Sequence, residues 1–322
     1  MKALVQDRYG SADVLAVREL PTPELNAGQV LVRVRAASVN ALDWHTMRGQ
    51  PSFIRLVGEG LRRPKTETRG ADLAGVVEAV GPGVTRLKPG DEVFGASVRT
   101  FAELAAVREE GLVLKPTTVT FEQAAASGVA AFTALQGLRD KGRLQAGERV
   151  LVHGAGGGVG SFGVQIAKAL GAEVTAVTGP ASLEMVRAIG ADRAIDYTTT
   201  DFTREGRTYD LVLDCSGTRS LGAVRRTLAP NGRHVIVGGP PRSSFGIILG
   251  LVSSVVVARF VSRKPISFLA HRTLADLEYI RELLAAGTIK PVIDRTYPLA
   301  QGAEAIRYVE TGHARGKVVV TI

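Results

Sequence analysis

The hydrophobic and polar positions divide the chain into a strand-rich part and a part in which strands alternate with helices. Up to about residue 115, runs such as "VLVRVRAASV" (30–39) alternate apolar side chains with basic ones, as half-buried strands do. The runs "AGVVEAVG" (74–81) and "GDEVFG" (90–95) predict further short strands, which the turns "GPG" and "KPGD" separate. We therefore expect a β-rich domain at the start of the chain.

The pattern changes near Thr120. The Ala-rich segment "TFEQAAASGVAAFTALQGL" (120–138) is typical of a helix, with Thr120 as its N-cap and Gln123 completing a capping box. From Arg149 onward, strand patterns alternate with helix patterns, and the predicted strands read "RVLVH", "EVTAV", "RAID", "YDLVLDC" and "GRHVIVGG". Repeated strand–helix units predict a parallel sheet with helices on both faces.

The C-terminal segment predicts a return to the first domain. The helix pattern "TLADLEYIRELLAAG" (273–287) places Leu274, Leu277, Ile280 and Leu284 on one face and ends at Gly287, a suitable C-cap. The final strand pattern "GKVVVTI" (316–322) is expected to join the β-rich domain. The predicted domains are therefore 1–120 together with 272–322, and 121–271.

The segment "VLVHGAGGGVG" (150–160) joins a predicted strand to a helix predicted over 159–170. Ala155, Gly157 and Gly160 have the G-x-G-x-x-G spacing, with alanine in the first place. The first small residue permits a tight turn, Gly157 lets a pyrophosphate approach the backbone, and Gly160 lets the helix pack close to the strand. Together with Gly158 and Val159, this loop is predicted to bind a dinucleotide phosphate at the helix N-terminus. A glycine-rich turn with a purely structural role is the alternative.

The end of the following strand indicates which dinucleotide is bound. Enzymes that use NAD usually carry Asp or Glu about 20 residues beyond the loop, bonded to the ribose. Here that place is taken by Thr178, Gly179, Pro180, Ala181 and Ser182, so no carboxylate would repel a 2′-phosphate. The sequence therefore favours NADP(H), with Thr178, Gly179 and Ser182 among its contacts. Capping of the next helix is the alternative role of the two hydroxyls.

Length and composition fit a two-domain globular protein, with 322 residues of which 45% are apolar. Cys215 is the single cysteine, which excludes an internal disulfide framework and a cysteine-based metal cluster. The first residues, "MKALVQDRYG", have neither the apolar core of a signal peptide nor the composition of a transit peptide. We therefore expect a cytoplasmic protein.

The formal net charge of +9 is concentrated in one stretch. From Cys215 to Ala275 there is no Asp or Glu, whereas nine Lys and Arg residues lie there. Such a stretch could attract a nucleotide, a nucleic acid or an anionic membrane surface, or it could form a solvated face. The longest uncharged apolar run, 243–258, is too short for a spanning helix. A place in the core or at a subunit interface is favoured for it, with a pocket wall or peripheral contact with a membrane as the alternatives.

Four stretches carry a resemblance to the medium-chain dehydrogenase/reductase superfamily: "AASVNALDWHTMRG" (36–49), "GADLAGVVEAVGPGVTRLKPGDEVFG" (70–95), "VLVHGAGGGVGSFGVQIAKALGA" (150–172) and "GHARGKVVV" (312–320). Within it, the chain is similar to the zinc-independent NADPH:quinone oxidoreductase branch, including its reticulon-interacting mitochondrial and chloroplast-envelope homologues. The resemblance implies an α/β protein with a GroES-like β-rich catalytic domain (1–120 and 272–322). The segment 121–271 would form a Rossmann domain with a doubly wound parallel sheet.

The resemblance also implies a site without metal. In zinc alcohol dehydrogenases the catalytic zinc takes two Cys and one His. Here Asn40 replaces the first Cys, Gly70-Ala71-Asp72 replaces the motif Gly-His-Glu, and no Cys stands near Val129. An NAD(P)-dependent alcohol dehydrogenase is therefore disfavoured, since no Lewis acid would polarise an alcohol or a simple carbonyl.

Hydride transfer from NADPH to a quinone or an α,β-unsaturated carbonyl needs no such Lewis acid, because the acceptor is already electrophilic. By the resemblance, the candidate catalytic residues are Asn40, Asp43 and His45, with His45 as a hydrogen-bond or proton donor and Asp43 orienting its loop. The implied cofactor contacts, besides those named above, are Asn40, Thr133, Tyr197, Cys215, Ser216, Gly238, Gly239, Phe268, Leu269 and Lys317. A surface histidine and a solvated lysine are the alternatives for His45 and Lys317.

The expected partners are a small-molecule quinone or activated alkene and, by the resemblance, a second copy of the chain in a homodimer. The alternative function is that of a nucleotide-dependent protein of low activity that binds a nucleic acid or a membrane surface. A nucleic acid is disfavoured, because no interleaved aromatic residues that could stack on bases accompany the basic stretch.

Overall fold

The computed structural model describes residues 1–50, 52, 55–56, 60–237 and 265–322. Within these ranges the chain forms two compact units, one made of Met1–Phe132 together with Arg272–Ile322 and the other of Thr133–His271. The first unit is therefore discontinuous along the sequence.

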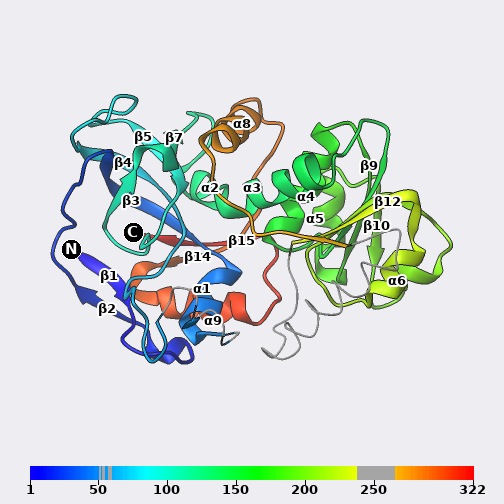
Figure 1. Cartoon of the computed structure of the whole chain (residues 1–322), viewed down its shortest axis with the longest axis horizontal. Coiled ribbons are helices and arrows are strands. Elements are labelled where there is room, and N and C mark those ends of the chain that lie inside the picture. The colour runs from blue at the N-terminus through cyan, green and yellow to red at the C-terminus, as the bar shows by residue number, and fades with distance from the viewer. Residues whose placement is uncertain (51, 53–54, 57–59, 238–264) are drawn as a thin grey trace. The chain divides into compact units, whose positions relative to one another are not determined.

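The first unit is built on a largely antiparallel seven-stranded sheet (Figure 1). Its order is β14–β15–β3–β4–β5–β7, β6 also pairs with β3, and β1 and β2 form a separate two-stranded sheet. The strands are β1 (Lys2–Val5), β2 (Ala16–Glu19), β3 (Gln29–Val39), β4 (Asp72–Val80), β5 (Glu92–Ala96), β6 (Leu104–Arg108), β7 (Leu112–Leu114), β14 (Ile293–Pro298) and β15 (Lys317–Thr321). The helices are α1 (Ala41–Arg48), α2 (Phe121–Ala126), α8 (Leu274–Ala285) and α9 (Gly302–Glu310), with short 3₁₀ turns at Ala12–Val14, Glu109–Gly111 and Leu299–Gln301.

The central strand β3 shows why this pattern forms a sheet. Val30, Val32 and Val34 are buried against β4 and β6, whereas Arg33 and Arg35 on the other face are exposed. The C-terminal strand β15 pairs antiparallel with β3, which confirms the predicted return of the chain to the first domain.

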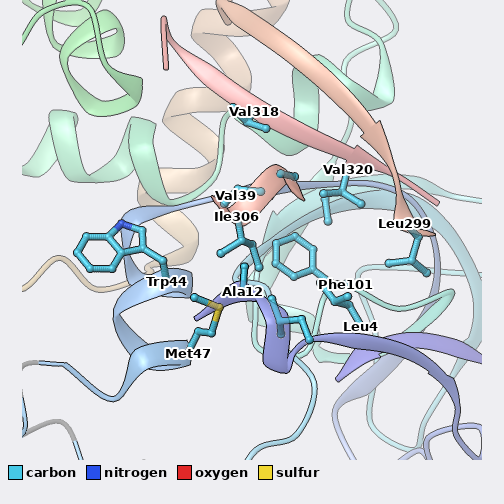
Figure 2. Close-up of a cluster of buried hydrophobic side chains, with 13 residues drawn as sticks. Leu4, Ala12, Val39, Trp44, Met47, Phe101, Leu299, Ile306, Val318 and Val320 are labelled. Carbon is cyan, nitrogen blue, oxygen red and sulfur yellow. The ribbon is translucent and has the colours of Figure 1, made fainter. Parts of the chain in front are cut away.

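A hydrophobic core beneath α1 joins segments that are far apart in the sequence (Figure 2). Its nearly or fully buried side chains include Leu4 of β1, Met47 of α1, Phe101, Ile306 of α9 and Val320 of β15. The cluster also contains Val39 and Trp44, which flank the start of α1 on both sides. The N-terminus of α1 is therefore held in place by the core of the first unit.

Asp43 fixes the first turn of α1. Asn40 is the N-cap residue, and its backbone N donates to Asp43 Oδ2 at 2.7 Å. Burial raises the pKa of the Asp43 carboxyl to about 7, the bond from Asn40 N opposes this shift, and the nearby Asp72 carboxylate adds to it. The carboxyl is thus half ionised near neutral pH.

The second unit contains a six-stranded parallel sheet in the order β10–β9–β8–β11–β12–β13. This is the doubly wound order of a Rossmann fold, with β8 as its first strand, and it confirms the predicted parallel sheet. The strands are β8 (Arg149–His153), β9 (Glu173–Thr178), β10 (Arg193–Asp196), β11 (Tyr209–Asp214), β12 (Leu228–Ile236) and β13 (Pro265–Ser267). The helices are α4 (Gly158–Ala169), α5 (Leu183–Ala188) and α6 (Leu221–Arg226), with 3₁₀ turns at Pro180–Ser182 and Phe202–Arg204.

The predicted helical segment after Thr120 is interrupted once. The capping box of Thr120 and Gln123 is present, but α2 ends at Ala126 and α3 (Val129–Leu135) begins after Gly128, followed by a π-helical turn over Gln136–Lys141. Asp72 causes the break, because its Oδ1 accepts from Val129 N at 2.7 Å and would lie 2.2 Å from a Cβ on Gly128. Only glycine fits at this point.

The first crossing between the units follows Phe132, whereas the sequence places it at 120. The reason is that α2 packs on β3, β4, β5 and β15 and so belongs with the sheet of the first unit. The second crossing is at Arg272, the residue that the sequence also indicates. None of the helices in the described ranges has both the length and the apolar character that crossing a membrane requires.

Replacement of Phe101 by Ala tests the core beneath α1. Phe101 is fully buried, so we expect the variant to lose about 3–5 kcal/mol of unfolding free energy in the first unit. Trp44 is the single tryptophan and belongs to the same cluster, so its fluorescence during urea denaturation reports this unit. The control Leu114→Ala, at a side chain that is half exposed, should change the value by less than about 0.5 kcal/mol. Equal losses in the two variants would contradict this core.

The raised pKa of Asp43 predicts a pH dependence of stability. The carboxyl ionises near its ordinary pKa of 3.8 in the unfolded chain but only near 7 in the folded one. Its contribution is therefore complete below about pH 4 and is lost as the pH rises to about 7. Asp43→Asn removes the titration and keeps an acceptor for Asn40 N. The unfolding free energy of the wild type, relative to this variant, should fall between pH 4 and 7; a constant difference would contradict the prediction.

Candidate functional site

The glycine-rich loop joins β8 to α4 in the second unit. β8 ends at His153 and α4 begins at Gly158, with Gly157 as its N-cap residue. Gly154 has a φ of +82°, which side chains rarely tolerate, so the turn depends on glycine there. A Cβ on Gly160 would lie 2.2 Å from Gly154 O, and this glycine therefore lets the first helical turn close against the loop.

At Gly157, in contrast, a side chain would have room within the protein. The nearest atom to a Cβ there would be Gly154 O, at 3.6 Å. Among the described residues, the amides of Gly158, Val159 and Gly160 find no acceptor, as is usual in the first turn of a helix. These amides and the positive end of the helix dipole fit a phosphate that approaches the backbone at Gly157.

Polar groups gather beside this loop at the ends of β9 and β10. A Cβ on Gly156 would lie 2.4 Å from Thr178 Oγ1 and 2.9 Å from Ser182 Oγ, so both hydroxyls pack against the loop. Tyr197 N donates to Thr178 O at 3.1 Å, and a Cβ on Gly179 would lie 3.2 Å from Tyr197 Oη. The residues predicted to contact the adenosine end of the cofactor are thus brought together.

The geometry at Ser182 does not support the alternative, in which these hydroxyls cap the next helix. Ser182 precedes α5 as its N-cap residue, but its side chain makes no capping hydrogen bond. No carboxylate belongs to the group of Thr178, Gly179, Ser182 and Tyr197. Ala155, in the first place of the glycine motif, is fully buried.

A buried carboxylate organises the next strand end. Asp214, the last residue of β11, accepts from His153 at 2.9 Å, from His234 at 3.3 Å, and from the amides of Ser216 and Gly217 at 3.1 and 2.8 Å. Burial alone would raise the pKa of Asp214, but the hydrogen bonds from the two histidines hold it well below its usual range. The carboxylate therefore stays ionised and fixes the turn that follows β11.

Cys215 follows Asp214 and directly precedes the two residues whose amides Asp214 binds. Burial raises the pKa of its thiol well above the usual range, and the charge of Asp214 adds to this. A thiol with a raised pKa ionises less readily, which makes it a weaker nucleophile. Ser216 Oγ lies 3.0 Å from Thr218 Oγ1.

The other predicted cofactor contacts of the second unit are more dispersed. Thr133 lies on α3 and is buried, whereas Leu269 is 91% exposed after β13. Phe268 packs near Gly137, and Lys141 Nζ lies 5.8 Å from the centre of its ring. Gly238 and Gly239 lie outside the described residues.

In the first unit, Asn40 and Lys317 are in direct contact. Lys317 is the first residue of β15, its side chain is 3% exposed, and its Nζ donates to Asn40 Oδ1 at 2.6 Å and to Val39 O at 3.1 Å. It also lies 3.4 Å from Asp72 Oδ2. Burial lowers the pKa of the Lys317 ammonium, and the charge of Asp72 opposes that shift. The alternative prediction, that Lys317 is a solvated lysine, is therefore wrong.

Asp72 connects four parts of this unit. Its Oδ2 accepts from Asn40 Nδ2 at 2.8 Å and from Ser38 Oγ at 2.7 Å, and its Oδ1 accepts from Val129 N at 2.7 Å. The carboxylate is fully buried. It therefore ties the end of β3 to the start of β4, to the start of α3 and, through Lys317, to β15.

His45 stands apart from this network, within α1. Its ring stacks on Trp44 at a centroid distance of 3.6 Å, and Nδ1 lies 3.0 Å from Gln50 O. Because a carbonyl only accepts, Nδ1 carries the proton in this bond, and Nε2 of the neutral ring is an acceptor. Burial lowers the pKa of His45, which favours the neutral ring.

The structure adds residues that the sequence did not mark as site residues: Ser38, Asp72, His153, Asp214 and His234. Two of them carried a detectable signal, since Asp72 and Asp214 are carboxylates at the ends of apolar strands, where burial is costly unless partners are present. Within the described ranges, no three His, Cys, Asp or Glu side chains converge in a way that could hold a metal ion.

Both units of the chain match known protein families. Residues 26–117 match the alcohol dehydrogenase GroES-like domain family, and residues 189–320 match the zinc-binding dehydrogenase family. The chain is 34% identical to the chloroplastic NADPH-dependent alkenal/one oxidoreductase of Arabidopsis thaliana, over 99% of this chain and 79% of that protein. It is 33% identical to the mitochondrial NAD(P)H oxidoreductase RTN4IP1 of Homo sapiens, over 100% and 89%.

Among solved structures, the quinone oxidoreductase from Coxiella burnetii superimposes with a TM-score of 0.87 at 29% identity, over 100% of this chain and 99% of that one. The sequence relatives span nearly the whole chain, and the fold has the two expected architectures. The chain therefore belongs to the medium-chain dehydrogenase/reductase superfamily, with a GroES-like domain and a Rossmann-like parallel-sheet domain.

Proposed function

We propose that the protein is an NADPH-dependent oxidoreductase that transfers a hydride to a quinone or an α,β-unsaturated carbonyl without a catalytic zinc. The observation that carries the proposal is the hydrogen-bonded network of Asn40, Asp72 and Lys317. Asn40 and Val129 stand where zinc-dependent members of the superfamily have Cys ligands, and both bind the Asp72 carboxylate. Amide, ammonium and backbone groups at these places are poor ligands for zinc.

The relatives support the proposed substrate class. Their names include an alkenal/one oxidoreductase and a quinone oxidoreductase. Quinones and enones share an electrophilic carbon conjugated to a carbonyl, so neither needs a metal to polarise it. An alcohol or a simple aldehyde lacks this conjugation, which is why alcohol oxidation is not proposed.

NADP(H) is the proposed cofactor, and the residues of the second unit fit it. The amides of Gly158, Val159 and Gly160 would bind the pyrophosphate at the space beside Gly157. The hydroxyls of Thr178, Ser182 and Tyr197 would donate hydrogen bonds to the 2′-phosphate, and no carboxylate in this group would repel it. The other predicted contacts, Ala155, Thr133, Gly179, Cys215, Ser216, Gly238, Gly239, Phe268 and Leu269, remain proposals.

In this mechanism, the bound nicotinamide supplies the hydride and the protein supplies position and electrostatics. Asn40 would present its amide to the oxygen of the acceptor, where negative charge develops. Asp43 would hold the first turn of α1, and hence Asn40, through its bond to Asn40 N. Burial lowers the pKa of His45 and its Nδ1–H is directed to Gln50 O, so we propose that the proton that completes the reduction comes from solvent.

Several basic side chains of the acid-free stretch (215–275) have partners in the structure. Arg233 pairs with Glu148 at 2.5 Å, Arg219 lies 3.8 Å from Asp201, and Arg272 donates to Ala96 O. Residues 238–264 lie outside the described part. In the rest of the stretch, nothing favours a nucleic acid or a membrane surface as a partner.

A homodimer and a cytoplasmic location also remain proposals. Within the described strands, β13 is the last in its sheet and offers an edge to which a second copy could pair. The relatives named as mitochondrial or chloroplastic give no support to the cytoplasm.

The proposed reaction is tested by cofactor oxidation. Purified protein should oxidise NADPH in the presence of a simple quinone or an enone, faster than it oxidises NADH, and a metal chelator should leave the rate unchanged. An absorbance assay at the NADPH band measures this directly. Loss of turnover with the chelator, or no turnover over a panel of quinones and enones, would contradict the proposal.

Gly157→Ala tests the cofactor site without disturbing the fold. A methyl group there has room in the protein but would occupy the space proposed for the pyrophosphate, so NADPH affinity should fall about tenfold or more. Gly222→Ala is the matched control, since it adds a methyl in open space on α6 of the same unit. Fluorescence titration with NADPH and thermal unfolding measure both variants. Unchanged NADPH affinity in Gly157→Ala would place the cofactor elsewhere.

A further inference from the structure

Lys317 is a buried cation that is held by three acceptors. Its ammonium contacts Asn40 Oδ1, Val39 O and Asp72 Oδ2, at 2.6, 3.1 and 3.4 Å. Taking an ammonium out of water costs several kcal/mol unless partners compensate, and apolar residues already anchor β15, since Val318 to Val320 are almost fully buried. Strand pairing alone therefore gives no reason for a lysine here.

The partners of Asn40 allow only one orientation of its amide. The Lys317 ammonium only donates, so it must face the carbonyl oxygen Oδ1, and the Asp72 carboxylate only accepts, so it must face Nδ2. The flipped amide would place NH₂ against the ammonium and a carbonyl against the carboxylate. Lys317 and Asp72 thus fix the amide from both ends.

This arrangement leaves one hydrogen of the amide weakly bound. One Nδ2 hydrogen is directed to Asp72 Oδ2 at 2.8 Å, whereas the other has only Ser38 O at 3.4 Å. A positive charge on the carbonyl oxygen of an amide draws electron density from its nitrogen, which makes the N–H groups stronger donors. The weakly bound hydrogen is therefore both activated and available to another acceptor.

We propose that Lys317 and Asp72 are positioning residues that orient and polarise the Asn40 amide, so that its weakly bound Nδ2–H stabilises the oxygen of the acceptor. The proposal rests on the proposed function. The hydride would come from the C4–H bond of NADPH, which would be oxidised to NADP⁺. Its addition forms a C–H bond at the β-carbon of an enone and moves the C=C electron pair toward the carbonyl, whose oxygen then carries the enolate charge; a proton from solvent completes the reduction. A donor held ready to bond this oxygen would lower the barrier, as in an oxyanion hole. Lys317 supplies its charge without touching the substrate.

Lys317→Met tests the role, with Lys115→Met as the matched control. Lys115 is also a buried lysine of the first unit, with bonds to Val119 O at 2.8 Å and an ion pair to Glu92 at 3.0 Å, but it has no contact with Asn40. We expect Lys317→Met to lower kcat about 10- to 100-fold with unchanged NADPH affinity, as losses of outer partners typically do. Lys115→Met should lose stability but keep its kcat.

The isotope effect separates positioning from general damage. With NADPH deuterated at the transferred position, the isotope effect on kcat should rise in Lys317→Met, because hydride transfer becomes slower than the other steps. It should not rise in Lys115→Met. If the wild-type protein is active but the two variants have equal kcat and equal isotope effects, this inference is overturned. The proposed function is then unaffected. Wild-type protein without turnover would instead contradict the proposed function.

A measurement on the wild type decides the matter if Lys317→Met does not fold. The chain has three asparagines, and Asn26 and Asn231 are exposed whereas Asn40 is buried. In protein labelled with ¹⁵N-asparagine, one of three side-chain amide signals should be protected from hydrogen exchange. With NADP⁺ and a hydroquinone, one of its two protons should shift downfield. Rapid exchange of all three amides, or no shift of the protected one, would overturn the proposal.

Discussion

The fully buried carboxylate of Asp72 is the constraint on which the first unit depends. It accepts hydrogen bonds from Ser38, Asn40 and the amide of Val129, and Lys317 balances its charge. A carboxylate in this position would be costly without so many partners, and the partners come from three separate parts of the chain. The same contacts interrupt the helical segment at Gly128, orient Asn40 and fix the lysine at the start of β15.

The second unit uses the same device at the end of β11. Asp214 is buried among His153, His234 and the amides of Ser216 and Gly217, and it remains ionised because these donors hold its pKa down. It fixes the turn after β11 while the glycine loop shapes the turn after β8. The carboxyl ends of adjacent parallel strands are where doubly wound sheets bind ligands, so rigid turns there favour cofactor binding.

Much of the fold could be predicted from the sequence, because it follows from local regularities. Alternation of valine with arginine marks β3, the strand–helix repeats give the parallel sheet, and "GKVVVTI" marks the strand that returns to β3. The glycine loop and the hydroxyl-rich end of β9 were also recognisable, because both are short, contiguous runs of characteristic residue types. The helical segment at 120–138 was only partly predicted, since a distant carboxylate breaks it.

The sequence by itself determined the types of elements, the doubly wound sheet, the glycine-rich loop between β8 and α4, and the presence of Asn40 where zinc-dependent relatives have a cysteine. The tertiary structure decided how the Asn40 amide is held, because its partners Asp72 and Lys317 lie 32 and 277 positions away in the chain. It also decided that His45 faces Gln50 and that Lys317 is buried rather than solvated. Periodicity and motif spacing record a residue's near neighbours, whereas hydrogen bonds and burial depend on segments that meet only when the chain folds.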